Sequence, residues 1–396
     1  MEVKSEPTLI RHFKGHLGRI NHLTFNPSST QIASSSADNS VMLWNFQQAA
    51  RCARFNAHVN SVNSVAWSPK GDLIASASSD RTVRMWVPKI NGAVGEFIAH
   101  PAPVRSIDFN HDGQKIITAS DDKSLKLWRT VSKQFVTSFT GHTNWVRSAK
   151  FNFSGELVAS CGDDKTIKIF DLDSGQAVHS FSDDRGLGRQ VAWHPDGCIV
   201  AAAMSTNRVK LYDIKAQKLI QLYHVHSKSV NAVAFHPSGN FLLTGSDDGT
   251  IKILDLLEGR PIYTLTGHIG KVTAVAFSKD GDYFATGGVD RQVNSFGFSL
   301  RFLGIVPLSP SLHNSVHLGN NTGEALVEDQ SVIINPMNTE SYNNHPECEN
   351  RHVLMAKEVF NVELRNLIFF KFIICIWRRG STSYRQNLKY IYYVSE

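Results

Sequence analysis

The 396-residue sequence has few cysteines and no long apolar run, and both absences narrow what the protein can be. Its five cysteines are an odd number without any CxxC spacing, which suits a reducing compartment. No run of about 18 apolar residues occurs, so no transmembrane helix is predicted. The N-terminus also lacks the apolar core of a signal peptide.

Sequence signatures of catalysis are missing as well. Neither a GxxxxGK[ST] phosphate-binding loop nor a GxSxG elbow occurs. Paired acids such as Asp121-Asp122 and Asp163-Asp164 recur at a fixed period, so turn formation explains them better than catalysis. His224 and His226 are close in sequence but do not make a full metal set. No cofactor, metal or small-molecule substrate is predicted, and an enzyme ranks third among the functions considered.

What the sequence does contain is a repeat with a period of 42 residues. The stretch from Gly141 to Asp171 shows its frame: Gly-His, an apolar segment, a Gly turn, a second apolar segment, a turn Asp and an aromatic. The His column is His16, His58, His100, His142, His226 and His268, with Asp184 as the exception. The turn Asp column is Asp38, Asp80, Asp122, Asp164, Asp248 and Asp290, with Thr206 as the exception. The aromatic column is Trp44, Trp86, Trp128, Phe170, Tyr212 and Phe296, with Leu254 as the exception. Seven units keep these columns in register.

Each unit is predicted to form four strands, because segments of period-two alternation lie between turn sequences such as Pro69-Lys70-Gly71-Asp72. Leu9 to Phe13 occupies the slot that holds the outer strand of the preceding unit everywhere else. It is therefore predicted to complete the last unit and close the ring, which removes exposed sheet edges.

This period, with its Gly-His opening and Trp-Asp-like closing, resembles the WD40 repeat. The predicted fold is all-β: a seven-bladed WD40 β-propeller over residues 8–298, closed by an N-terminal strand. Residues 1–7 are predicted to be disordered. Residues 299–396 are predicted to form a largely disordered C-terminal tail, with a short helix in 353–377. The apolar segment from Asn366 to Trp377 is too short to span a bilayer, and a divergent or alternatively spliced terminus is favoured over a membrane anchor.

The polar columns are predicted to form a hydrogen-bonded tetrad in each blade, because buried polar groups need partners. Two units hold all four residue types, and their members are His58, Ser76, Asp80 and Trp86, and His100, Thr118, Asp122 and Trp128. Unit five has Asp184, Ala202, Thr206 and Tyr212 instead. It has lost three of the four types together, so blade five is predicted to be the least rigid.

One column differs between units and is the candidate partner-binding site. Its members are Asn21, Asn63, Arg105, Arg147, Arg189, Asn231 and Thr273. The three arginines lie on consecutive blades and are predicted to form a basic arc at the rim where the Gly-His loops open. Trp145 beside the arc gives it the composition of an interface hot spot, and Lys123 and Lys165 extend it. The alternative is that the arginines pair with Asp121 and Asp163 of the same face.

The net charge of +6 lies in residues 1–298, because the remainder holds equal numbers of basic and acidic residues. A basic excess favours acidic partners such as nucleic acid, anionic membrane or acidic protein tails. The alternative interpretation is that the basic excess serves only to keep the protein soluble, and both interpretations stay open.

Beyond the generic repeat, residues 8–296 are similar to the Poc1 (protein of the centriole one) family of centriolar WD40 proteins. The residues that carry the resemblance are LIRHFKGH at Leu9 to His16, WSPKG at Trp67 to Gly71, TASDDKSLKLW at Thr118 to Trp128, NWVRSAKF at Asn144 to Phe151, and the stretch from Phe235 to His268. The last includes Leu254 in place of Trp, a departure that generic WD40 proteins need not share.

The resemblance implies a non-enzymatic scaffold of centrioles and basal bodies that acts in centriole assembly and stability and in cilium formation. It implies centriolar proteins and microtubules as partners, and a place in the cytoskeleton of the cytoplasm, at the centrosome. The family usually ends in a coiled coil, but no sustained heptad is present here, so oligomerisation through it is not predicted. The alternative function is a WD40 platform in another assembly, such as an RNA-processing or ubiquitin-ligase complex. Nucleic acid is not expected, because rows of aromatics for base stacking are not visible.

Overall fold

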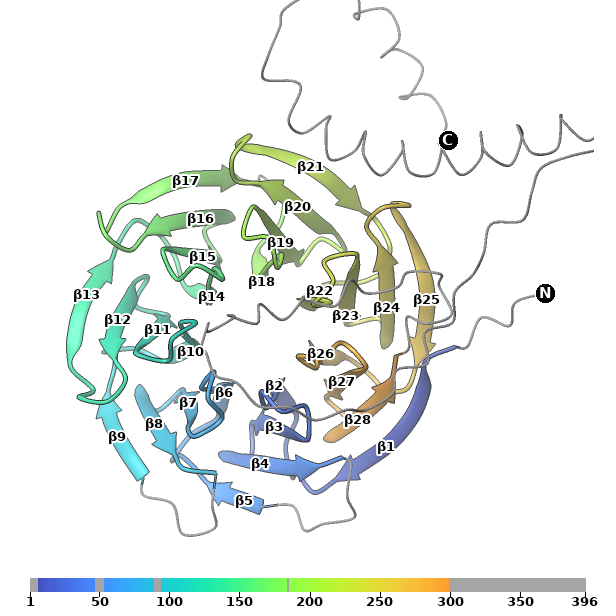
Figure 1. The fold of residues 1–396 in the computed structure, drawn as a ribbon, viewed down its shortest axis with the longest axis horizontal. Helices are drawn as coiled ribbons and strands as arrows, with labels where there is room; N and C mark the ends of the chain where they lie inside the picture. Colours follow the sequence, from blue (N-terminus) through green and yellow to red (C-terminus); the bar gives the residue numbers. More distant parts are fainter. Residues whose placement is uncertain (1–5, 47–52, 89–93, 184, 299–396) are drawn as a thin grey trace, which may run out of the picture. The chain divides into compact units, whose positions relative to one another are not determined.

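The computed structural model describes residues 6–46, 53–88, 94–183 and 185–298. Throughout these ranges the regular elements are β-strands, arranged as seven four-stranded antiparallel sheets around a common axis (Figure 1). The prediction of an all-β, seven-bladed propeller is confirmed. The predictions for residues 1–5 and for the tail from 299 to 396, including its helix, lie outside the described residues.

Each blade runs from an inner strand at the axis to an outer strand at the circumference. Blades one and two contain β2 (Ile20–Phe25), β3 (Gln31–Ser36), β4 (Ser40–Asn45) and β5 (Ala53–Asn56), then β6 (Val62–Trp67), β7 (Ile74–Ser78), β8 (Thr82–Trp86) and β9 (Val94–Ile98). Blades three and four contain β10 (Val104–Phe109), β11 (Lys115–Ser120), β12 (Leu125–Arg129) and β13 (Phe135–Phe139), then β14 (Val146–Phe151), β15 (Leu157–Gly162), β16 (Thr166–Asp171) and β17 (Ala177–Ser182). Blades five and six contain β18 (Gly188–Trp193), β19 (Ile199–Met204), β20 (Val209–Asp213) and β21 (Lys218–Tyr223), then β22 (Val230–Phe235), β23 (Phe241–Ser246), β24 (Thr250–Asp255) and β25 (Arg260–Thr266).

Blade seven is made from both ends of the propeller sequence. Its inner three strands are β26 (Val272–Phe277), β27 (Tyr283–Gly288) and β28 (Gln292–Gly297), and its outer strand is β1 (Thr8–Lys14). β1 pairs antiparallel with β28, with Phe13 opposite Val293 (Figure 1). The predicted closure by the N-terminal strand is confirmed, and it leaves no open blade between the first and last units.

The core lies between neighbouring blades. The apolar side chains of β2 and β3 pack against those of blade seven, so that Ile20 and Ile32 share a cluster with Ala274 and Val293. Ile20 and Ile32 are fully buried. Each fully buried side chain of this size contributes about 2 kcal/mol relative to exposure, so the blades hold one another in place.

Every inner strand has a β-bulge near its start. In β10, for example, Val104 lies opposite Ser120 and Ser106 lies opposite Ala119, so Arg105 has no partner in the ladder. The same shift occurs in β2, β6, β14, β18, β22 and β26. A bulge turns one residue out of the regular alternation and re-aims its side chain. The bulged residues are the members of the variable column.

Candidate protein-interaction site

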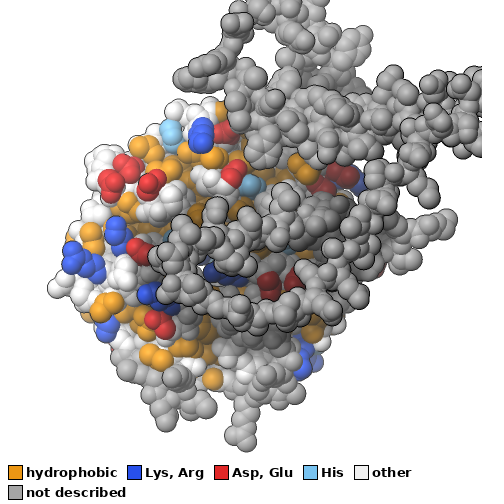
Figure 2. Space-filling model, viewed as in Figure 1, with side chains coloured by type: hydrophobic (Ala, Val, Ile, Leu, Met, Phe, Trp, Pro, Cys, Tyr) orange, Lys and Arg blue, Asp and Glu red, His pale blue; other side chains and the backbone are white. Residues whose placement is uncertain are grey.

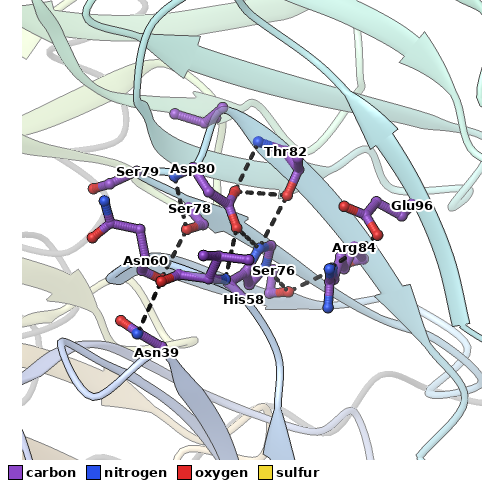
Figure 3. Close-up of polar contacts among 12 residues, drawn as sticks. Asn39, His58, Asn60, Ser76, Ser78, Ser79, Asp80, Thr82, Arg84 and Glu96 are labelled. Carbon is purple, nitrogen blue, oxygen red and sulfur yellow. Dashed lines mark hydrogen bonds and ion pairs between the residues drawn. The ribbon is translucent and has the colours of Figure 1, made fainter.

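The tetrads fix the loops of one face of the propeller. In blade two the imidazole of His58 lies between strand β7 and the turn that leads to β8 (Figure 3). His58 Nδ1 is 2.9 Å from Asp80 Oδ2, and Nε2 is 2.8 Å from Ser76 Oγ. Trp86 Nε1 donates to the same Ser76 oxygen at 3.1 Å. The structure thus brings the four residues of this predicted tetrad together.

The chemistry of the four groups sets the direction of the hydrogen bonds. The indole can only donate and an ionised carboxylate can only accept. Ser76 therefore donates to His58 Nε2, and His58 Nδ1–H donates to Asp80. Burial, which exceeds the opposing effect of Asp80, lowers the pKa of His58 from its ordinary value of 6.5. The imidazole is neutral at pH 7, as this network requires.

Blade three repeats the arrangement. His100 Nδ1 is 2.6 Å from Asp122, His100 Nε2 is 2.8 Å from Thr118 Oγ1, and Trp128 Nε1 donates to Thr118 Oγ1 at 3.0 Å. Burial alone would raise the pKa of Asp122, but hydrogen bonds from His100 and Ser124 outweigh it and lower the value to about 2.

A further member of these networks was not foreseen from the sequence. A hydroxyl two residues after the turn Asp donates to its carboxylate, as Thr82 does to Asp80 at 2.6 Å (Figure 3). The same contact is made by Ser40, Ser124, Thr166 and Thr250 in other blades. The signal was present in the sequence as a Ser or Thr column, but such residues are common in turns and did not stand out.

Blade five is stabilised by a different polar contact. Asp183, one residue before the His column, is buried and forms an ion pair with Lys210 on β20 at 2.8 Å. The side chains are 7% and 11% exposed, respectively. Thr206 Oγ1, at the turn Asp position, is buried and has no hydrogen-bond partner among the residues that the structure describes. A buried ion pair thus stands where other blades have a hydrogen-bonded tetrad.

The asparagines of the bulge column brace neighbouring blades. Asn21 Nδ2 donates to the carbonyl of Val62 at 2.8 Å, and Asn63 Nδ2 donates to that of Val104 at 2.7 Å. Asn231 makes the equivalent bond to Val272, and the Thr273 hydroxyl donates to Ile20. This role of the bulge column was not predicted from the sequence. Blades three, four and five replace these braces with arginine, so the arginines occupy positions where the fold elsewhere prefers a short amide or hydroxyl.

Two arginines of the basic arc are paired with carboxylates of their own blades. Arg105 Nε and Nη2 donate to the two oxygens of Asp121 at 2.8 and 2.5 Å, and Arg147 binds Asp163 with the same distances. The pairing with Asp121 and Asp163 that the sequence left as an alternative is therefore present for two of the three arginines. The arc carries less free positive charge than expected, because each of these guanidiniums is held in a bidentate pair.

Trp145 lies against both of these guanidiniums. Its ring centroid is 5.9 Å from the guanidinium carbon of Arg105 and 5.0 Å from that of Arg147, within cation–π range. The indole is still 43% exposed. The structure therefore presents a fixed, partly exposed aromatic between two paired arginines, rather than an open row of cations.

The other predicted members of the site are more scattered. Arg189 is half-buried, and its Nε lacks a hydrogen-bond partner among the described residues. Lys123 and Lys165 are exposed and occupy the left-handed turn position after the turn Asp, with φ values of 71° and 62°. The structure thus brings Arg105, Trp145 and Arg147 into contact with one another.

The face that carries the Gly-His loops and the turn Asps, here called the Gly-His face, has a strong bias in exposed charge. Its described Asp residues are all buried or half-buried, because they accept hydrogen bonds in tetrads or pair with a nearby cation. Its exposed charged side chains, among the residues described, are all Lys or Arg. This set, here called the cation ring, comprises Arg19, Arg81, Lys123, Lys165, Arg185, Lys228, Lys271 and Arg291.

The opposite face is mixed in charge. Its turns and loops expose carboxylates such as Asp112, Glu156 and Asp280 alongside cations such as Lys70 and Lys279. In the space-filling view of one face, Lys and Arg side chains are spread around the ring, interspersed with Asp and Glu and with hydrophobic and uncharged side chains, rather than gathered in one patch (Figure 2). The bias of the Gly-His face is therefore a difference between the two faces, not a single basic patch.

Three apolar side chains stand out on the Gly-His face in consecutive blades. Leu17, Val59 and Ile269 directly follow the tetrad histidines of blades one, two and seven, and they are 68%, 82% and 86% exposed. Their backbone N–H groups donate to the turn Asps at 2.8, 3.2 and 3.1 Å, which fixes these loops. These three residues are here called the apolar arc.

The part of the chain that the structure describes holds no group of three or more His, Cys, Asp or Glu arranged to bind a metal ion. It also contains no helix that is long and apolar enough to cross a membrane. Cys161 is buried in β15, and burial raises the pKa of its thiol.

Comparison with known protein families identifies the family to which this propeller belongs. The family described as "WD domain, G-beta repeat" matches residues 7–45, 50–87, 92–129, 133–171, 217–255 and 259–296, more than half of the chain. The chain belongs to the WD40-repeat family. Unit five is matched instead, over residues 183–233, by the "Anaphase-promoting complex subunit 4 WD40 domain".

Individual relatives narrow the resemblance. The chain is 59% identical over 50 residues to the POC1 centriolar protein homolog of Drosophila melanogaster. It is 50% identical over 53 residues to POC1 centriolar protein homolog B, and 53% over 49 residues to homolog A, both of Danio rerio. These alignments cover 12–13% of this chain and 11–13% of the relatives. The predicted similarity to centriolar WD40 proteins is confirmed, over a segment of that length.

Proposed function

We propose that the protein is a non-enzymatic WD40 scaffold of centrioles and basal bodies, acting in centriole assembly and stability and in cilium formation. The observation that carries this proposal is the 50–59% identity to proteins named POC1 centriolar protein homolog, together with a propeller that extends well beyond the aligned segment. A WD40 propeller serves as a rigid platform for other proteins, and its function depends on the residues that differ between blades.

The geometry of the acid pairs supports a role without catalysis. In Asp121-Asp122 the first carboxylate binds Arg105 and the second binds His100. Asp163-Asp164 repeats this with Arg147 and His142. All four carboxylates are thus engaged in contacts that hold the blade.

The contact trio of Arg105, Trp145 and Arg147 is the proposed centre of the partner-binding site, with Arg189, Lys123 and Lys165 at its margin. Trp145 is an aromatic anchor whose orientation is set before binding, which lowers the entropic cost of association. Centriolar proteins are the proposed partners. Tubulin is included because its tails are acidic, and an acidic segment suits the exposed cations around the trio.

The trio can be tested by a single substitution that leaves both ion pairs in place. Trp145→Ala is expected to reduce recovery of bound proteins from cell extracts at least about tenfold, as loss of a hot-spot aromatic does. Phe153→Ala, which truncates an aromatic that is 67% exposed in a turn of the opposite face, is the matched control. Equal recovery with both variants would remove the trio from the binding site.

The second candidate function is a WD40 platform in a ubiquitin-ligase assembly, favoured only by the family match of unit five. Proximity labelling with the full chain in dividing cells distinguishes the two. Centriolar proteins among the most enriched neighbours support the proposed function. Enrichment of ubiquitin-ligase or RNA-processing components in their place would favour the alternative.

A further inference from the structure

The charge bias of the Gly-His face follows from the way the repeat folds. Each tetrad needs a turn Asp, and that carboxylate is turned inward to accept from the histidine, as Asp38 does from His16 at 2.9 Å. The positions around it are not needed for the tetrad and remain exposed. In the described residues these exposed positions carry positive charge in every blade, which the fold itself does not require.

The buried carboxylates limit the distance over which the exposed cations attract anions. They are ionised, since hydrogen bonds from Thr250 and neighbouring groups outweigh burial and lower the pKa of Asp248 to about 2, and Asp164 behaves alike. Together with the other described Asp residues of this face, they are at least as numerous as the exposed cations of the ring. Beyond a Debye length of about 10 Å the two layers largely cancel, so the ring attracts anions mainly in contact.

This short range discriminates between classes of partner. A protein surface that binds nucleic acids or anionic membranes does so through a dense positive charge, whose potential acts over a long range. A protein segment with spaced carboxylates needs only local contacts with individual Lys and Arg side chains. The apolar arc also favours a protein partner over a nucleic acid. Leu17, Val59 and Ile269 make no favourable contact with a phosphate backbone, but they can pack against apolar side chains of a peptide.

We infer that the Gly-His face binds an acidic amphipathic protein segment, whose carboxylates contact the cation ring and whose apolar side chains contact the apolar arc. This inference deepens the proposed scaffold function by naming the chemistry of the partner. The apolar arc lies on blades seven, one and two, whereas the Trp145 trio lies on blades three and four. The segment is therefore expected to engage a part of the face that the trio does not cover.

The direct test is binding of synthetic probes to the purified full chain. A fluorescent peptide of alternating Glu and Leu is compared, by anisotropy, with a poly-Glu peptide of equal length, poly-uridine RNA, and phosphatidylcholine vesicles containing phosphatidylserine. The Glu-Leu peptide is expected to bind at least about tenfold more tightly than poly-Glu. Tighter binding of RNA or vesicles than of the Glu-Leu peptide would overturn the inference, as would absence of peptide binding.

Charge variants locate the site. The variant in the cation ring combines Arg19→Glu, Arg185→Glu and Lys228→Glu, and its matched control on the opposite face combines Lys70→Glu, Lys215→Glu and Lys279→Glu. Both change the net charge equally at exposed positions. The ring variant is expected to weaken peptide binding at least about tenfold, and the control less than about twofold. Equal weakening would show that only net charge matters and would overturn the inference.

Apolar variants test the second half of the site. Leu17→Ser, Val59→Ser and Ile269→Ser are combined, and the control combines Val131→Ser, Phe153→Ser and Leu257→Ser on the opposite face. The arc variant is expected to lose the preference for Glu-Leu over poly-Glu while the control keeps it; retention of the preference in both would overturn the role of the arc. A protein that marks centrioles in cells but binds no peptide would overturn this inference alone.

Discussion

At the scale of single residues, the stability of each blade depends on a small buried network with a fixed direction. In blade two the turn carboxylate of Asp80 accepts from His58, from Thr82 and from the backbone N–H of Val59. Such a network is strong when complete, because each group meets a partner in a low-dielectric environment. It is correspondingly sensitive to the loss of one member.

Asp80→Ala is therefore expected to lower the free energy of unfolding by about 2 kcal/mol, since it leaves several donors unpaired. Thr206→Ala, at the same column of blade five, is the control. Its hydroxyl has no hydrogen-bond partner within the described part of the chain, so the change is expected to stay within about 0.5 kcal/mol. Denaturant titration of both variants measures the difference, and similar losses would contradict the account.

The histidines also predict how stability depends on pH. Burial is the main cause that lowers the pKa values of His16, His58, His100, His226 and His268 below 6.5. The unfolded chain thus takes up protons near pH 6.5 that the folded propeller does not, and stability must fall as the pH falls below that value. The carboxylates extend the loss at lower pH, because the folded-state pKa of Asp122 is about 2, below its ordinary value of 3.8.

Thermal unfolding between about pH 7.5 and about pH 5.5 tests this dependence. The midpoint is expected to drop by several degrees over that interval. A midpoint that is constant, or that rises as the solution becomes more acidic, would mean that the buried histidines are not neutral in the folded state.

At the scale of the element, the blades are similar in backbone and different in what stabilises them. The four strands and their order could be predicted from turn sequences and period-two alternation, and so could the closing strand β1. The bulge in each inner strand could not, because its residue is polar in every unit and looks like part of the alternation. The inter-blade bonds of Asn21 and Asn63 follow from that bulge and were missed for the same reason.

Blade five is expected to open more readily than the others. Its Asp183–Lys210 pair replaces several hydrogen bonds, and the cost of burying two charges offsets much of their attraction. Backbone amides from Val200 to Tyr212 should therefore exchange faster than those from Leu73 to Trp86 in blade two. Hydrogen exchange measured by mass spectrometry on the native protein tests this prediction. Slower exchange in blade five would show that its ion pair stabilises a blade more than the hydrogen-bonded tetrad of blade two does.

At the scale of the whole propeller, the two faces differ in what they expose. The repeat itself could be predicted from the sequence, and with it the tetrads that bury the acids of the Gly-His face. The pairing of Arg105 with Asp121 stayed open, because sequence columns do not fix the rotamers of a residue in β10 and a residue in the turn after β11. The cation ring was hidden for another reason: its members come from several different columns, and only the fold gathers them on one face.

The central claim, a WD40 scaffold at the centriole, is tested most directly by where the protein lies in a cell. The measurement is fluorescence imaging of the full chain in dividing cells, beside a centriole marker and beside residues 1–298 alone. We expect the full chain to mark centrioles throughout the cell cycle, and residues 1–298 to do the same if the propeller carries targeting. Diffuse fluorescence from both, with no enrichment at the marker, would contradict the account.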